Sequence, residues 1–204
     1  MGEEALATGA EGDDFRDEDW YAAEIGAVRF TGCTFTDVDL SEVTTTGTVF
    51  EDCTFSRCRF NSSTHHTSAF VGCDFKRTSF FDATFDGCKL TGSSFSQCTL
   101  RPLKVAGGQW RAVNLRGADL SGLDLTGVDL RETDLAMAKL VGTCLAGAQL
   151  ESVTFREADL QDADLRRATL HASDLPSARL KQTKVDLAGA VLLAESVGAE
   201  VDTA

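Results

Sequence analysis

The sequence predicts a solenoid of square coils that ends in a short helix. Three observations lead to this prediction: a strict five-residue period, two apolar positions in every period, and loss of the period after Val185. The period is clearest in residues 116–135, RGADLSGLDLTGVDLRETDL, where leucine recurs at every fifth residue and follows Asp each time. A period of five fits neither the helical period of about 3.6 nor the two-residue alternation of a strand. An internal repeat is therefore the first interpretation to pursue.

The five-residue period runs without a phase slip from Phe15 to Val185. Its central residue falls on every multiple of five, and of these 35 residues only Thr45 and His65 are polar. The residue two before each centre is mostly small or apolar, and the other three are polar, charged or glycine. With two inward residues in every five, each pentapeptide forms one side of a square, so twenty residues make one coil. Residues twenty apart then stack in a column, and neighbouring coils bury one another's apolar side chains.

The repeat A(D/N)Lxx resembles the pentapeptide-repeat family over residues 13–187. This resemblance implies an all-β fold, a right-handed quadrilateral β-helix. A narrower similarity, to the MfpA and Qnr proteins, is carried by four segments: DDFRDED (13–19), LRPL (100–103), LRGADLSGLDLTGVDLRETDL (115–135) and VDLAGAVLLAESVGAEV (185–201). Proteins of that group bind DNA gyrase, a topoisomerase, and lower susceptibility to fluoroquinolones. The resemblance thus implies gyrase as the partner.

The chain divides into three predicted parts: a disordered tail at 1–12, the β-helix at 13–185, and a helix with a tail at 186–204. Asp186 is the expected N-cap of the helix and Gly198 its stop. The helix lies at an open end of the solenoid, where unpaired strand edges must be covered or paired. One interpretation is a simple cap. The resemblance instead implies a homodimer, and the residues expected at that interface are Leu187, Ala190, Val191, Ala194 and Val197.

Charge and hydropathy restrict the classes of partner. The net charge of −13 argues against direct nucleic-acid binding, which needs a basic surface. It favours a basic partner, or it simply maintains solubility. No apolar run approaches the roughly 20 residues that span a bilayer, and the N-terminus lacks the features of a signal peptide. We therefore expect a cytoplasmic protein without membrane contact.

Neither an enzyme nor a metal or cofactor site is expected. Six of the seven cysteines occupy the small inward position and none forms a CxxC pair, so packing is the favoured role; Cys144 should point outward as a surface thiol. His65, His66 and the distant His171 are too few for a metal site. Thr45 lies one coil before His65, and a contact between them would satisfy both polar groups. A β-helix enzyme would need protruding loops, but the repeats contain no insertion.

The regular aspartates are the candidate contacts for a partner. We select seven of them: Asp119, Asp124, Asp129, Asp134, Asp159, Asp162 and Asp164. The simpler interpretation is that Asp before Leu is only part of the repeat. The functional one is DNA mimicry, with carboxylates in place of phosphates. Six of the 13 net negative charges belong to Glu3, Glu4, Glu11, Glu195, Glu200 and Asp202 near the two ends, so the rest of the chain carries only −7. This is far below one charge per about 1.7 Å of DNA, so mimicry must be local.

Two functional hypotheses follow. The first is a non-enzymatic DNA mimic that binds and modulates DNA gyrase and protects it from fluoroquinolones. The second is a pentapeptide-repeat scaffold for another partner, for example in self-immunity to a topoisomerase poison. The sequence leaves open the gyrase subunit, the acidic face in contact, and whether protection or inhibition dominates.

Overall fold

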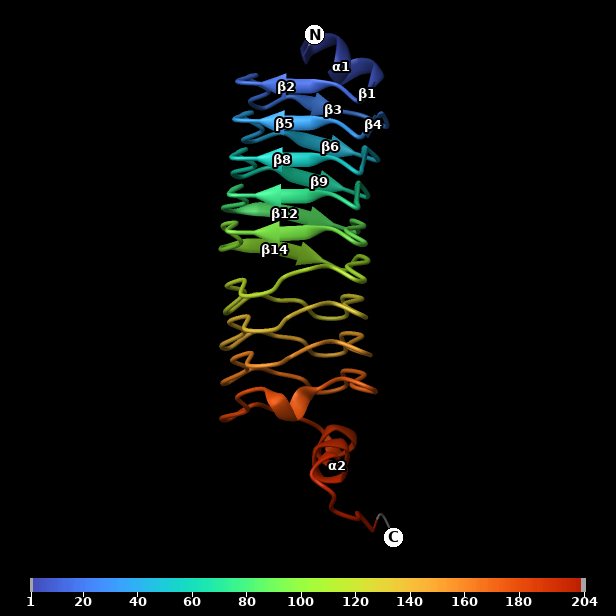
Figure 1. Ribbon diagram of the computed structural model, residues 1–204, viewed down its shortest axis with the longest axis vertical. Helices are drawn as coiled ribbons and strands as arrows, with labels where there is room; N and C mark the ends of the chain where they lie inside the picture. The colour runs from blue at the N-terminus through green and yellow to red at the C-terminus, as the bar shows by residue number, and fades with distance from the viewer. Residues whose placement is uncertain (1, 203–204) are drawn as a thin grey trace.

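The computed structural model describes residues 2–202 and shows a rod of stacked coils with the two termini at opposite ends (Figure 1). The fold is the predicted right-handed quadrilateral β-helix, with about five turns bearing strands. A helix, α2 (Leu187–Ser196), follows the last coil, as expected. The chain therefore buries its apolar residues along one continuous axis.

Three sides of the square are parallel sheets, named below by their last strands. The β10 side contains β1 (Ala10–Glu11), β4 (Arg29–Thr31), β7 (Val49–Glu51) and β10 (Ala69–Val71). The β13 side contains β2 (Asp14–Arg16), β5 (Thr34–Thr36), β8 (Thr54–Ser56), β11 (Asp74–Lys76) and β13 (Ser94–Ser96). The β14 side contains β3 (Glu24–Ile25), β6 (Thr44–Thr46), β9 (Thr64–His66), β12 (Ala83–Asp86) and β14 (Leu103–Ala106). On the fourth, the bridge side, single β-bridges join successive coils.

The twenty-residue register is confirmed along the rod. It begins with Ala10 opposite Phe30 and is still present where Asp164 lies opposite Lys184. The chain turns a corner two residues after a central residue of the repeat, and the corner residue adopts a left-handed backbone. At Gly122, for example, φ is +71°. Glycine reaches this region without the steric cost of a Cβ atom, which explains its recurrence at this position of the repeat.

The core consists of columns of like side chains. Phe30, Phe50 and Phe70 stack with ring centroids 5.0 Å apart at each step. This separation is close to the strand spacing of about 4.8 Å, so the rings follow the backbone ladder. Leucines replace phenylalanines in the C-terminal half, and Leu140 and Leu145 are fully buried. The predicted columns are thus confirmed.

Polar residues at the small inward position are satisfied by the preceding coil. Cys53 Sγ lies 3.4 Å from the carbonyl of Phe30, and Ser93 Oγ lies 2.7 Å from the carbonyl of Phe70. Each is a donor to the carbonyl 23 residues earlier, so a thiol and a hydroxyl serve equally. Burial raises the pKa of Cys58 to about 11. These contacts support packing as the role of the inward cysteines.

His65 forms the predicted contact with Thr45. The Thr45 hydroxyl lies 2.8 Å from Nδ1 of His65, and the Ser63 hydroxyl lies 2.9 Å from Nε2. Both ring nitrogens therefore have partners inside the core. Burial, reinforced by the nearby His66, lowers the pKa of His65 to about 3. The imidazole is neutral and structural.

The N-terminal segment differs from the expected disordered tail. Residues Gly2–Thr8 form a helix, α1, and Ala10–Glu11 pairs with β4 as strand β1. The physical reason is the open end of the rod: Ala5 is 6% exposed, and Leu6 packs against the core. The helix covers apolar side chains of the first coil that would otherwise contact water.

The backbone ladder is interrupted near the middle of the rod. In a regular coil the N–H of a central residue donates to the carbonyl nineteen residues later, as Leu120 does at 2.8 Å. Within residues 2–202, neither Leu100 nor Val105 makes this bond to the next coil. Pro102 between them has no N–H to donate. The ladder resumes at Trp110, whose N–H donates at 2.7 Å.

The two facing segments, residues 97–107 and 116–126, are called the seam below. Core side chains are more exposed at the seam: Leu103 and Leu123 are 6% exposed, whereas Leu140 is fully buried. The two coils are therefore joined there mainly through side-chain packing. Nothing in the five-residue pattern indicates this interruption, because the apolar positions continue through it.

Candidate functional site

The seven candidate aspartates lie on all four sides of the rod. Asp119 and Asp159 share a column on the bridge side, and Asp124 and Asp164 share one on the β14 side. In the first column Lys139 lies between the two aspartates and opposes their charge, whereas in the second column the residue between them is Cys144. The remaining three are Asp129 on the β10 side, Asp134 on the β13 side, and Asp162 at a corner with φ of +59°. The structure therefore does not gather the seven into one surface.

Four of the seven aspartates are neutralised by arginines. The ion pairs join Asp119 to Arg101 at 3.3 Å, Asp129 to Arg131 at 2.7 Å, Asp159 to Arg179 at 3.0 Å and Asp164 to Arg166 at 2.5 Å. The arginine hydrogen bond lowers the pKa of Asp164 to about 2. Each of these four carboxylates therefore already has a basic partner within the chain.

Asp124, Asp134 and Asp162 have no basic partner among residues 2–202. Asp124 and Asp162 are exposed, and Asp134 is half-buried. Hydrogen bonds from the hydroxyl and N–H of Thr126 lower the pKa of Asp124. These three are the candidates that remain available to a basic side chain of a partner.

The aspartates also have a structural role, which supports the simpler interpretation of the repeat. Asp124 accepts a hydrogen bond from the N–H of Thr126 at 3.0 Å, and Asp134 accepts one from the N–H of Ala136 at 2.8 Å. A short carboxylate that bonds the backbone two residues on stabilises a turn. Asp before the central Leu is thus explained by the corner that follows it, without a partner.

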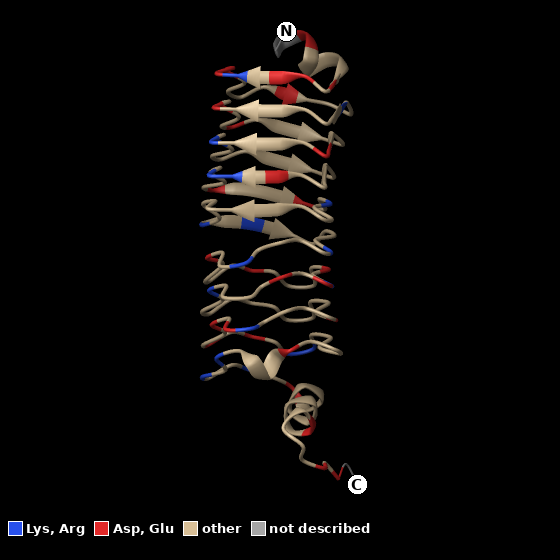
Figure 2. Ribbon diagram, in the orientation of Figure 1, with Lys and Arg blue, Asp and Glu red and all other residues tan. Residues whose placement is uncertain are grey.

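The densest acidic region lies at the N-terminal end of the rod, away from the seven candidate aspartates (Figure 2). Seven acidic residues fall within residues 11–24 and only one basic residue, Arg16, which pairs with Asp14 at 2.7 Å. None of these residues is among the seven predicted contacts, because residues 13–19 served only as a motif and Glu11 was counted with the tail. The excess of acidic over basic residues within residues 11–24 would have indicated this region from the sequence.

Helix α2 covers the end of the rod with one face and exposes the other. Asp186 is its N-cap, as predicted, and its carboxylate accepts from the N–H of Gly189 at 3.0 Å. Leu192 and Leu193 pack against the core. Of the five predicted interface residues, Leu187 and Val197 are 77% and 76% exposed. Ala190 is exposed as well, and Val191 and Ala194 are half-buried.

Within residues 2–202, no three His, Cys, Asp or Glu side chains are grouped so as to hold a metal ion. None of the described helices has the length and apolar character needed to cross a bilayer. Cys144 is half-exposed on the β14 side, with its Sγ 3.2 Å from the hydroxyl of Thr126.

Comparison with known proteins identifies similar sequences and folds. Two family models described as pentapeptide repeats match residues 66–140 and 143–182, together more than half of the chain. The model of the SV2A/B/C luminal domain matches residues 10–80. No curated protein sequence matches significantly.

Among solved structures, the chain is similar to QnrB1, described as a plasmid-mediated fluoroquinolone resistance protein. A trypsin-treated variant of QnrB1 is 21% identical with a TM-score of 0.58, over 96% of this chain and 98% of that one. Full-length QnrB1 is 20% identical with a TM-score of 0.55, over 93% of this chain and 99% of that one. At this identity the likeness establishes a shared fold.

Proposed function

The chain belongs to the pentapeptide-repeat family, and we propose that it is a cytoplasmic, non-enzymatic protein that binds DNA gyrase and protects it from fluoroquinolones. The observation that carries the proposal is a rod matching QnrB1 over nearly the full length of both chains. QnrB1 is described as a fluoroquinolone resistance protein. The motifs of residues 13–19 and 115–135 support the same group.

Recognition of gyrase would rest on a few carboxylates rather than on a uniform charge. Asp124, Asp134 and Asp162 lack basic partners among the described residues and could receive lysines or arginines of gyrase. Because they lie on different sides, one flat surface cannot contact all three. Attraction between exposed charges is screened by salt, so binding should weaken as ionic strength rises.

A supercoiling assay with gyrase and a fluoroquinolone tests the proposal. The added protein should restore supercoiling, and the triple variant Asp124→Asn, Asp134→Asn, Asp162→Asn should do so less well. No rescue and no effect on gyrase by the unaltered protein would sink the proposal. Binding to each isolated gyrase subunit would then identify the one contacted.

The control variant changes the net charge equally at the other end: Glu11→Gln, Asp17→Asn and Glu24→Gln. All three residues are exposed, without ion-pair partners in the described chain. It should retain the rescue. Equal loss in both triple variants would show that total charge, and not the selected aspartates, determines binding.

A homodimer through α2 is part of the proposal. The exposed Leu187 and Val197 offer apolar surface that a second copy would bury. Light scattering should give a dimer at micromolar concentration, and Leu187→Asp with Val197→Asp should give a monomer. A monomeric unaltered protein would contradict this part.

The second candidate is a scaffold for another partner, for example in self-immunity to a topoisomerase poison. It is favoured by the internal neutralisation of Asp119, Asp129, Asp159 and Asp164, which reduces the resemblance to DNA. Capture from a native lysate distinguishes the two. Recovery of a partner without either gyrase subunit would favour the scaffold.

A further inference from the structure

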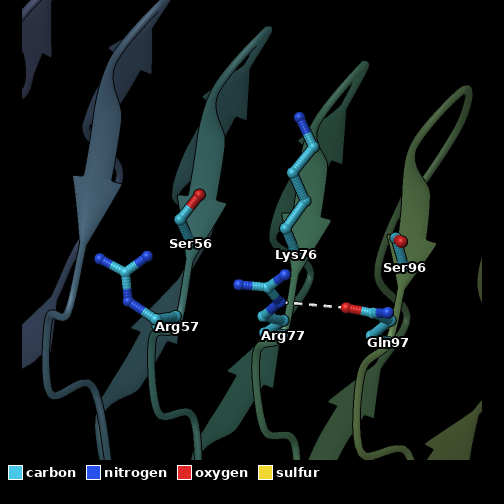
Figure 3. Close-up of a pocket in the computed structure, with 6 residues that line it drawn as sticks. All are labelled: Ser56, Arg57, Lys76, Arg77, Ser96 and Gln97. Carbon is cyan, nitrogen blue, oxygen red and sulfur yellow. Dashed lines mark hydrogen bonds between the residues drawn. The ribbon is translucent and has the colours of Figure 1, made fainter.

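A basic groove crosses three coils on the β13 side, in the N-terminal half of the rod. Its lining is Ser56, Arg57, Lys76, Arg77, Ser96 and Gln97, around a space of about 310 Å³. Figure 3 shows Arg57, Arg77 and Gln97 in one row and Ser56, Lys76 and Ser96 in the next. The rows are fixed by the ladder, since Ser56, Lys76 and Ser96 are register partners in β8, β11 and β13.

The positive charge in the groove is only partly balanced. Arg57 makes a two-point ion pair with Asp37, at 2.7 and 2.6 Å, on the side facing away from Arg77. Lys76 reaches Asp74 only at 3.6 Å. Arg77 has no carboxylate partner within residues 2–202, and its Nε donates to Oε1 of Gln97 at 3.0 Å.

The unused hydrogen-bonding groups of the groove are chiefly donors. The Nη atoms of Arg77 and the ammonium of Lys76 are available, and the hydroxyls of Ser56 and Ser96 have no partner in the described chain. The two guanidinium groups lie one coil apart, about 4.8 Å along the axis, and repel each other. Asp37 offsets the charge of Arg57, but the charge of Arg77 has no such partner in the described chain. Arginine and lysine with hydroxyl donors are the groups that bind phosphate oxygens.

We propose that this groove binds a phosphate group, either free inorganic phosphate or that of a small phosphate monoester. Arg77 and Lys76 supply the charge, and Ser56 and Ser96 donate from the coils on either side. The site lies on a different part of the rod from Asp124, Asp134 and Asp162. It would give an acidic protein one surface that responds to an anion, independently of the gyrase proposal.

The test is an NMR titration of ¹⁵N-labelled protein with inorganic phosphate and, separately, with glycerol phosphate. Sodium chloride holds the ionic strength constant. The side-chain signals of Arg77 and Gln97 should shift and saturate, while those of Arg167 should not. Saturation with either probe supports the site and identifies which form it accepts. Shifts that never saturate, or that chloride alone reproduces, overturn it.

Two variants sharpen the result. Arg77→Gln should weaken binding at least about tenfold, the effect of losing a hydrogen bond to a charged group. Glutamine suits this corner, because Gln97 holds the same place one coil on, with φ of +56° against +52°. Arg167→Gln is the matched control, at an equivalent corner with φ of +63°, and should bind as the unaltered protein does. Undiminished binding by a folded Arg77→Gln variant would refute the assignment.

Discussion

Lowering the pH from about 7 to about 4 should destabilise the rod through His65, whose imidazole is fully buried. The ring stacks on Phe85 with centroids 4.9 Å apart, and its two nitrogens face the hydroxyls of Thr45 and Ser63. Within residues 2–202, neither nitrogen meets a carboxylate. A charge formed on the ring would therefore be paired only with neutral dipoles.

The direction and size of the effect follow from the two pKa values. The unfolded chain takes up a proton below its ordinary pKa of 6.5, whereas the folded protein keeps His65 neutral until about 3. Stability is thus fully present above 6.5 and is lost as the pH falls between these values. Integrated from about pH 7 to about pH 4, the loss amounts to about 3 kcal/mol.

The variant His65→Phe isolates this contribution. Phenylalanine already occupies the same column at Phe85, and the hydroxyls of Thr45 and Ser63 keep partners in Ser68 and the carbonyl of Phe60. Denaturant unfolding at both pH values gives the two free energies of unfolding. The unaltered protein should lose about 3 kcal/mol more than the variant on acidification. Equal losses would refute the reasoning, whatever the stability of the variant at neutral pH.

Three further predictions concern the seam, the surface thiol and the C-terminal helix. The amide of Leu100 at the seam should exchange hydrogen faster than that of Leu120, by about tenfold or more, since it lacks the bond to the next coil; equal protection would show that the ladder is continuous. Cys144 should be the first thiol to react with a thiol reagent in the native protein, and Cys144→Ala should remove this fastest reaction, because five of the six inward thiols are buried and burial raises the pKa of the sixth, Cys98, to about 11. Asp186→Ala should reduce the helical circular dichroism signal of α2, because the Asp186 carboxylate caps the helix by accepting from the N–H of Gly189. An unchanged spectrum would show that packing alone holds the helix.

Much of the fold was predictable because each coil repeats one local rule. Spacing alone placed Thr45 over His65, and the 2.8 Å contact confirms it. The change from a five-residue to a helical period correctly placed α2 and its cap at Asp186. Both predictions depend only on neighbours in one column or one turn, which the pattern specifies directly.

The failures concern interactions that the period does not encode. Asp119 and Asp124 look equivalent in sequence, yet only Asp119 has an arginine, Arg101, within reach. That difference depends on which carboxylate a long arginine side chain reaches in a neighbouring column. A residue's place in the repeat does not determine this. The seam escaped notice because Leu100 and Val105 keep the apolar phase while their N–H groups lose their partners. Helix α1 was missed because a need to cover the open end does not appear as periodicity.

The distribution of paired charges limits how the rod could imitate DNA. Duplex DNA presents a phosphate about every 1.7 Å on a continuous surface. In this rod a column advances one residue per coil, about 4.8 Å, and Lys139 separates Asp119 from Asp159. No column can therefore reach the charge density of DNA. A partner that recognises the rod must read its shape together with individual carboxylates such as Asp124. Replacing Asp124 by Asn should then weaken binding of that partner far more than removing one negative charge at the N-terminal end, for example by Asp17→Asn.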